Sequence, residues 1–262
     1  MIQPIKNRVR LFCADIDPLT MPEAVSLISS WLQLPQKLCR FVITPNVDHI
    51  VKFQKDAGLQ AAYKQASMVV TDGKPVVWAA NFLGVKIPET VPGSDLVPAI
   101  FDHAQANNLP ICVYLLGAMP GVADRAKAVI QTKWPVITVV GTLSPDFGFE
   151  KKPVISSLIC KKINASGADL LVIGLGAPKQ ELWVSHYAAE LSVKVALCVG
   201  ATIDFIAGEK ARAPLWMQEV GLEWLHRLLS EPKRLAKRYT IDAVIFPQLV
   251  FKEWLLRKGT RK

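Results

Sequence analysis

The amino-acid sequence predicts an α/β protein: a mostly parallel sheet covered by helices, followed by a basic helical appendage at the C-terminal end. Short runs that are apolar throughout alternate with segments of helical apolar spacing, as expected when parallel strands are buried on both faces. The chain has 262 residues and 51% of them are hydrophobic, so it can bury a large core. We divide it into a core at residues 1–209 and an appendage at residues 210–262.

The expected strands and helices alternate along the core. The apolar runs expected as strands are Phe41–Thr44, Met68–Thr71, Ile111–Leu116, Val136–Val140, Leu170–Ile173 and Val195–Val199. Segments with helical spacing lie between them, at Asp48–Gln65, Leu96–Ala106, Gly121–Lys133, Val154–Ala165 and Lys179–Leu191. Residues 68–80 pass from a strand into a further helical stretch, with Thr71, Asp72 and Gly73 at the junction.

Positive charge is concentrated in the appendage. The whole chain has a formal net charge of +9. Residues 210–262 hold twelve Lys and Arg against five Asp and Glu, which gives them a net charge of +7. A basic appendage on a nearly neutral body predicts contact with anions, which leaves three partner classes: ligand phosphates, an acidic membrane surface or nucleic acid.

The sequence predicts a cytoplasmic protein without a membrane-spanning segment. No N-terminal stretch combines a basic start, an apolar centre and a cleavage site, and the longest apolar runs are of strand length. The cysteines are scattered and mostly lie in apolar surroundings, so we interpret them as reduced core residues: Cys13, Cys39, Cys112, Cys160 and Cys198.

Polar and glycine-rich segments follow the expected strands, where ligands bind in a parallel α/β sheet. Glycine permits close backbone approach and the free amides of a following helix attract anions, so these segments favour a phosphate-bearing ligand. They are residues 44–46, 71–73, 117–121, 174–180 and 200–202. Lys179 stands where a dinucleotide fingerprint needs a small residue, and no P-loop sequence is present. Ordinary strand-to-helix turns explain the same glycines equally well.

Asp72 allows two interpretations. An aspartate before a glycine and a helical run is a favoured helix N-cap. A carboxylate at the carboxyl end of a strand can also accept a proton from a substrate hydroxyl, and a partly desolvated site raises its pKa toward a useful range. The two roles compete, because one carboxylate cannot fully serve both at once.

Metal and nucleophile sites find little support. The histidines show no ligand spacing (His49, His103, His186 and His226), and no Gly-x-Ser-x-Gly elbow is present. The Asp-x-Asp pattern of Asp15 and Asp17 precedes the alternating units, and we interpret it as a loop. The sequence therefore predicts neither a bound metal nor another cofactor.

The appendage combines basic and apolar groups. A helical stretch restarts at Pro232, and the spacing of Arg234, Lys237 and Arg238 places three positive charges on one helical face. Large apolar residues follow, at Ile245, Phe246, Leu249, Phe251 and Trp254. This pattern is typical of a solvated basic face or of an interfacial membrane helix. An expected break at Pro247, together with Asp242, argues against a transmembrane span.

A series of short motifs occurs in order across about residues 10–240. The series is Thr44-Pro45-Asn46, Thr71-Asp72-Gly73, Val91-Pro92-Gly93-Ser94-Asp95-Leu96, Leu116-Gly117, Ser144-Pro145-Asp146-Phe147-Gly148, Gly174-Leu175-Gly176-Ala177-Pro178-Lys179-Gln180-Glu181, Val199-Gly200-Ala201, Asp204-Phe205, and Arg212-Ala213-Pro214 through Gly221-Leu222-Glu223-Trp224. It resembles the WecG/TagA/CpsF family of glycosyltransferases, and so many ordered motifs make the resemblance specific.

The resemblance implies a Rossmann-type enzyme without an essential metal that moves a sugar, with inversion, from a UDP-sugar to a polyprenyl-diphosphate-linked saccharide during surface polysaccharide assembly. It implies that Asp72 is the catalytic base and that Thr44 and Asn46 line the same pocket. It also assigns substrate binding to residues of the other motifs: Gly73, Ser94, Asp95, Gly117, Asp146, Gly174, Gly176, Pro178, Lys179, Gln180, Glu181 and Arg212. UDP-N-acetylmannosamine, its uronic acid and UDP-glucose all stay open as donors, as do the acceptor saccharide and a homo-oligomeric state.

The resemblance also implies that the basic appendage closes over the active site at the membrane and brings arginines to the diphosphate. Arg227 and Arg234 occupy matching positions, while the third holds Lys237 with Arg238 next to it. Lysine lacks the planar fork of arginine, so the sequence leaves open which of these two supplies the third contact. The expected location is peripheral, on the inner face of the cell membrane.

The expected reaction is a direct displacement. Asp72 deprotonates an acceptor hydroxyl as its oxygen attacks the anomeric carbon, and UDP leaves from the opposite face, stabilised by strand-end amides and by Arg227 and Arg234.

Two other classes fit parts of the sequence. A nicotinamide-dependent dehydrogenase fits the sheet but lacks the dinucleotide fingerprint. A nucleic-acid-binding protein fits the charge, but the apolar content of the appendage exceeds what phosphate contact requires.

Overall fold

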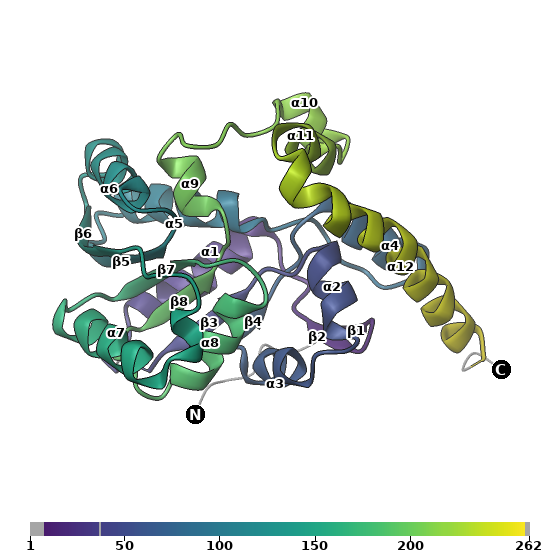
Figure 1. Ribbon diagram of the computed structural model, residues 1–262, viewed down its shortest axis with the longest axis horizontal. Coiled ribbons are helices and arrows are strands. Elements are labelled where there is room, and N and C mark those ends of the chain that lie inside the picture. The colour runs from purple at the N-terminus through teal and green to yellow at the C-terminus, as the bar shows by residue number, and fades with distance from the viewer. Residues whose placement is uncertain (1–7, 37, 260–262) are drawn as a thin grey trace.

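A six-stranded parallel sheet forms the centre of the protein, as a computed structural model describes for residues 8–36 and 38–259. The spatial order of the strands is β4-β3-β8-β7-β5-β6 (Figure 1). Their bounds are β3 Arg40–Ile43, β4 Met68–Val69, β5 Ile111–Gly117, β6 Ile137–Leu143, β7 Leu170–Gly174 and β8 Val195–Cys198. All five neighbouring pairs run parallel. The predicted α/β class, with a mostly parallel Rossmann-like sheet covered by helices, is therefore confirmed.

Helices cover both faces of this sheet. On one face the buried cluster includes side chains of α2 (Val47–Phe53), α3 (Ala57–Gln65), α4 (Lys74–Phe82), α7 (Pro153–Ala165) and α8 (Lys179–Tyr187). On the other it includes α1 (Met21–Leu32), α5 (Gly93–Ala106), α6 (Val122–Lys133) and α9 (Thr202–Ile206). Adjacent strand residues point to opposite clusters, so Val42 packs on one face and Ile43 on the other. The uniformly apolar strands are explained by this double covering.

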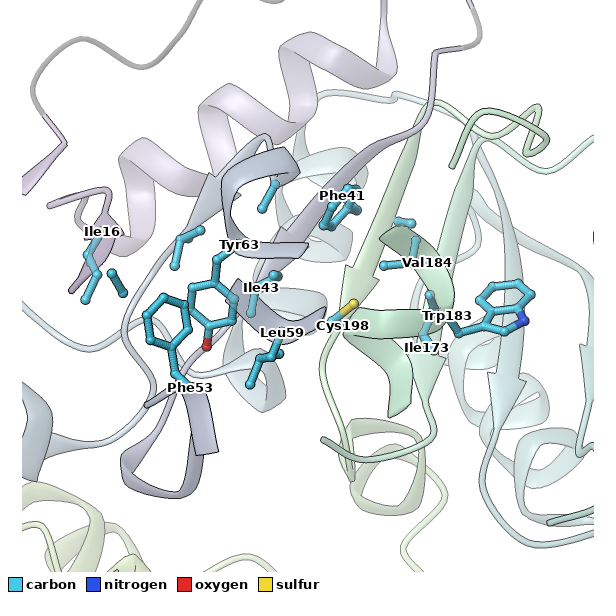
Figure 2. Packing of buried hydrophobic residues seen from close by; sticks show 14 of the residues in the cluster. Ile16, Phe41, Ile43, Phe53, Leu59, Tyr63, Ile173, Trp183, Val184 and Cys198 are labelled. Carbon is cyan, nitrogen blue, oxygen red and sulfur yellow. The ribbon is translucent and has the colours of Figure 1, made fainter. Parts of the chain in front are cut away.

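The first of these clusters positions the elements that follow β3. Figure 2 shows Phe53 of α2 and Tyr63 of α3 side by side, and their ring centroids lie 4.9 Å apart. Ile43 and Leu59 lie beside them in the same view. The single helix predicted at residues 48–65 is wrong in this respect: the chain forms two helices. Asp56 starts the second one, because its side chain accepts a hydrogen bond from the Leu59 amide.

The loop predicted at Asp15 and Asp17 is wrong for Asp15, which lies in an antiparallel hairpin of β1 (Val9–Leu11) and β2 (Ala14–Ile16). Asp17 follows β2 and lies outside the described strands and helices. Asp17 is 1% exposed and pairs with Arg8 at 2.9 Å, while its second oxygen accepts the Val69 amide at 2.7 Å. Its carboxylate thus joins the hairpin to the sheet, and the described residues contain no group of His, Cys, Asp or Glu arranged as a metal site.

The appendage forms α10 (Leu215–Glu219), α11 (Glu223–Ser230) and α12 (Pro232–Gly259), which is continuous through Pro247. The predicted break at Pro247 is therefore wrong. A proline inside a helix costs one backbone hydrogen bond, but Phe246, Leu249 and Trp254 pack on the buried cluster and hold the helix on both sides of it. Figure 1 shows α12 starting beside α11 and running past α2. Among the described helices, none is long and apolar enough to cross a membrane.

Candidate active site

A cavity of about 470 Å³ lies between the strand ends of the core and the appendage. One wall comes from the segments that follow β3 and β4, and the opposite wall comes from α10, α11 and α12. Six of the predicted site residues line it: Asn46, Asp72, Gly73, Asp95, Arg227 and Arg238. The cavity therefore brings the predicted base together with two cations from the other end of the chain.

Backbone pairing beyond the two strands fixes the positions of Asn46 and Asp72. The Val70 amide donates to the Ile43 carbonyl at 3.0 Å, and the Asp72 amide donates to the Pro45 carbonyl at 2.7 Å. The two polar residues therefore leave the sheet side by side. Gly73 then turns the chain into α4 with a φ of 97°, which residues with a side chain rarely adopt.

The Asp72 side chain belongs to the cavity and not to the helix. The cap position of α4 is Gly73, and no side-chain hydrogen bond caps that helix. The N-cap interpretation of Asp72 is therefore wrong. Burial raises the pKa of the Asp72 carboxyl to about 6, and the strongest opposing influence is the positive charge of Arg227. A carboxyl group of this kind is ionised near neutral pH, yet it holds a proton more readily than an exposed aspartate.

Two arginines of the appendage supply positive charge. Arg227 of α11 has its Nε 3.9 Å from a Glu223 oxygen, and its guanidinium lies over the Phe205 ring at 5.1 Å. The Arg238 Nε of α12 is 3.6 Å from Asp48 and 3.8 Å from Asp242. These contacts are longer than good hydrogen bonds, so both guanidinium groups keep donors for a further anion.

The other predicted cations lie outside the cavity lining. Arg212 forms a bidentate ion pair with Asp95 and donates to Gln218 at 3.1 Å. It thereby fastens the start of α5 to the appendage. The side chain of Arg234 is 58% exposed and pairs with Glu231, and Lys237 is exposed. Of the two candidates for the third phosphate contact, the structure places Arg238 in the cavity wall and Lys237 outside it.

The glycines at or after the carboxyl ends of β5, β7 and β8 do not line the cavity. A Cβ atom on Gly117 would lie 2.5 Å from the Gly174 carbonyl oxygen, and one on Gly174 would lie 2.8 Å from the Gly200 carbonyl oxygen. Close packing of neighbouring strand ends therefore accounts for these two glycines. Four more predicted residues here are absent from the lining, namely Asp146, Gly176, Pro178 and Lys179, as is Ser94 at the start of α5.

Three predicted residues are buried below the site. Thr44 donates its hydroxyl to the Cys198 carbonyl at 3.2 Å, which ties the end of β3 to the end of β8. Gln180 is 2% exposed and Glu181 is fully buried. None of the three lines the cavity. Their contacts are with other protein groups, so any effect they have on a ligand in the cavity passes through neighbouring residues.

Residues 9–260 match the Glycosyl transferase WecG/TagA/CpsF family. The chain belongs to this family. Its relatives include N-acetylglucosaminyldiphosphoundecaprenol N-acetyl-beta-D-mannosaminyltransferases of Staphylococcus aureus strains MRSA252 and MW2. Each is 26% identical over 239 residues, which cover 91% of either chain. The membership does not favour the two alternative classes, a dehydrogenase and a nucleic-acid-binding protein.

Eight polar or charged residues of this WecG/TagA/CpsF protein line the cavity but are not among the predicted site residues. They are Asp48, Lys74, Thr90, Gln218, Glu219, Glu223, Tyr239 and Asp242. The sequence contains a signal for Asp242 alone, because Arg238, Asp242 and Phe246 recur every four residues and share one face of α12. The position of Asp48 on the opposite wall depends on how α12 packs against α2. Metal-independent catalysis stays a prediction.

Proposed function

We propose that this family member transfers a sugar from a UDP-sugar to a polyprenyl-diphosphate-linked saccharide, with inversion at the anomeric carbon. The activity for which the Staphylococcus aureus relatives are named supports N-acetylmannosamine as the sugar and N-acetylglucosaminyl-diphosphoundecaprenol as the acceptor. The observation that carries the proposal is a carboxyl group of raised pKa, Asp72, facing one cavity with Arg227 and Arg238. The cavity thus pairs a base with the cations that a departing diphosphate requires.

In the proposed reaction, an Asp72 oxygen accepts the proton of the acceptor hydroxyl as that hydroxyl oxygen bonds to the anomeric carbon. The bond between this carbon and the UDP oxygen breaks, and its electron pair stays with the diphosphate. Attack and departure on opposite faces of the sugar give inversion. Arg227 and Arg238 stabilise the negative charge of the departing UDP diphosphate by charge-assisted hydrogen bonds. Their placement in a partly desolvated cavity strengthens that effect.

The surface beside the cavity supports a peripheral position on the inner face of the cell membrane. Exposed large apolar side chains occur on every helix of the appendage: Leu215, Trp216, Leu229, Ile241, Val244, Phe251 and Leu255. Trp78 and Phe82 of α4 continue this surface, since the Trp78 ring lies against Gly221. Large apolar groups among basic residues are characteristic of helices that lie in the membrane interface.

The transferase activity is tested with purified protein, a short-chain polyprenyl-diphosphate N-acetylglucosamine and a panel of UDP-sugars. Mass spectrometry of the lipid product identifies the sugar that has been added. We expect N-acetylmannosamine transfer, loss of transfer in Asp72→Asn, and normal transfer in Asp15→Asn, whose side chain lies in the β1–β2 hairpin outside the cavity lining. No product with any donor, or an unimpaired Asp72→Asn enzyme, would refute the proposal.

Membrane association is tested by sedimentation with vesicles of phosphatidylglycerol or phosphatidylcholine. Trp216→Ser/Phe251→Ser removes apolar groups from the proposed surface, whereas Val154→Ser/Leu158→Ser changes equally exposed groups on α7. We expect the first pair to weaken binding to the anionic vesicles and the second pair to leave it unchanged. Equal binding of both variants would contradict the proposed membrane surface.

A further inference from the structure

Glu181 is a fully buried carboxyl group that the proposed displacement does not use. It lies in the first turn of α8, and its Oε1 accepts a hydrogen bond from the Gln180 side chain at 2.7 Å. The same oxygen is 3.2 Å from His49 Nε2. Its Oε2 has no hydrogen-bond partner within the described residues. Burying a carboxyl group with an unpaired oxygen costs folding free energy, so a function of Glu181 is needed to explain its retention at this position.

His49 of α2 links this carboxyl group to the cavity wall. Its Nδ1 accepts the Asn46 backbone amide at 3.4 Å. The side-chain oxygen of Asn46 is 3.1 Å from the same nitrogen, but an Nδ1 that accepts the amide forms no hydrogen bond with another acceptor. An ionised carboxyl group only accepts hydrogen bonds, so His49 must carry a proton on Nε2 to contact Glu181 favourably. Glu181 therefore fixes both the orientation and the protonated nitrogen of the imidazole.

In the series of contacts from Glu181 through His49 to Asn46, Asn46 is the residue that lines the cavity. Its Oδ1 accepts the His49 backbone amide at 3.3 Å and so caps α2. With that oxygen engaged by the backbone amide of His49, the free hydrogen-bonding group of the side chain is Nδ2, which has no partner among the described residues. Asn46 and Asp72 line the same cavity. The amide group is thus available to an acceptor atom that lies beside the carboxyl group.

Gln180 stabilises Glu181, at the opposite end of this series of contacts. Its Oε1 accepts two backbone amides, those of Gly176 and Gly200, each at 3.2 Å. These amides belong to the segments that follow β7 and β8. The first turn of α8 is therefore hydrogen-bonded to the segments after β7 and β8 through Gln180, and it contacts α2 through Glu181. These contacts hold the Glu181 carboxyl group in place.

From this geometry we infer that Glu181 and His49 are positioning residues that hold Asn46 with its Nδ2 group directed at an oxygen atom of the sugar that reacts beside Asp72. The inference rests on the proposed transferase function. It adds a role for the buried pair that does not require either residue to touch substrate. A displaced amide donor would lower the rate of the chemical step more than it would weaken binding, because alignment matters most in the transition state.

A double-mutant cycle between Glu181 and Asn46 tests the inference. Glu181→Met keeps the approximate volume but removes the acceptor, while Glu181→Gln keeps an oxygen that can accept from both Gln180 and His49. We expect Glu181→Met and Asn46→Ala each to lower kcat roughly 10- to 100-fold with little change in KM. The double variant should be no slower than Asn46→Ala alone, and Glu181→Gln should keep most of the activity.

A second measurement does not depend on turnover. Nitrogen-15 NMR of the imidazole should show a proton on His49 Nε2 in the unmodified protein and a changed protonation pattern in Glu181→Met. His186→Asn, an exposed histidine on the same helix as Glu181, serves as the control and should leave kcat unchanged. If Glu181→Met does not fold, His49→Gln, which keeps a donor for Glu181 but not the contact with Asn46, replaces it in the cycle.

The outcomes separate this inference from the proposed function. Multiplicative losses in the double variant, or equal losses in Glu181→Gln and Glu181→Met, would overturn the positioning role while leaving the transferase activity in place. An unmodified protein that transfers no sugar would instead refute the proposed function, and the NMR result would still report on the contact between His49 and Glu181.

Discussion

The Arg227 guanidinium and the Asp72 carboxyl group line the same cavity, although 155 positions in the sequence separate them. Among the charges around Asp72, that of Arg227 lowers the pKa of the carboxyl group most, against the larger effect of burial. The appendage thus does more than cover the strand ends. It also lowers the pKa of the residue proposed as the base, which connects closure of the cavity with readiness for proton transfer.

The rate of sugar transfer is expected to fall in acid as Asp72 gains a proton. Burial raises the pKa of this carboxyl group to about 6, and only the ionised form accepts a proton. The kcat should therefore be constant above about pH 7 and fall tenfold per pH unit well below 6. Asp72→Asn should lower kcat about 100- to 10,000-fold. A pH profile without an acidic limb between pH 5 and 7 would exclude Asp72 as the base.

Removing the charge of Arg227 should move that acidic limb. Arg227→Gln takes away the main influence that lowers the pKa of Asp72, so the limb should shift to higher pH. The kcat above the limb should also fall about 100-fold, because one donor to the departing diphosphate is lost. Arg227→Lys is the matched control: it keeps the charge, so the limb should stay near its original pH. An unshifted limb in Arg227→Gln would contradict this electrostatic link.

Arg238 should contribute to catalysis while Lys237 should not. Arg238 lines the cavity and Lys237 is exposed, although the two are adjacent in sequence. Arg238→Gln should lower kcat/KM for the UDP-sugar about tenfold or more, because charge-assisted hydrogen bonds to the departing diphosphate are lost. Lys237→Gln should change it less than about twofold. Steady-state kinetics with both variants test this, and a larger effect of Lys237→Gln would reverse the assignment.

Much of the core could be predicted because each strand is covered on both faces. That covering requires uninterrupted apolar runs, and a run such as Leu170–Ile173 is visible in the sequence without knowledge of its neighbours. The hairpin of β1 and β2 has strands of only three residues, too short for a clear alternating pattern. Helix α1 does have a sequence signal, since Thr20 and Glu23 form a capping box.

The candidate site was less predictable because it depends on contacts between distant segments. The motif that contains Asp72 indicates a strand end, but only the fold places Arg227 opposite it. Likewise, the glycine at position 117 suggests a phosphate site, whereas its close approach to Gly174 reflects strand packing. In α12, the direction of each cation follows from which helix face packs against α2, and the sequence alone does not specify that face.

Asp242 should make the stability of the protein depend on pH. Burial, and then the nearby charge of Asp48, raise the pKa of its carboxyl group from the usual 3.8 to about 6, against the charges of Arg238, Lys52 and His49. The folded state therefore holds this proton more tightly than the unfolded chain. The unfavourable contribution of Asp242 is small below about pH 4, grows as the pH rises toward 6, and is constant above that.

Asp242→Asn removes this titration and retains the size of the side chain. Its free energy of unfolding should exceed that of the unmodified protein by up to about 3 kcal/mol at pH 8, and the difference should shrink steadily toward pH 4. Loss of the contact with Arg238, 3.8 Å away, will reduce the gain because that ion pair is partly buried. Urea unfolding of both proteins between pH 4 and 8 measures the difference. If the increase in the free energy of unfolding does not change with pH, the prediction is wrong. It is also wrong if Asp242→Asn is the less stable protein and its deficit is largest at pH 8, because the ionised Asp242 carboxylate would then not destabilise the folded state.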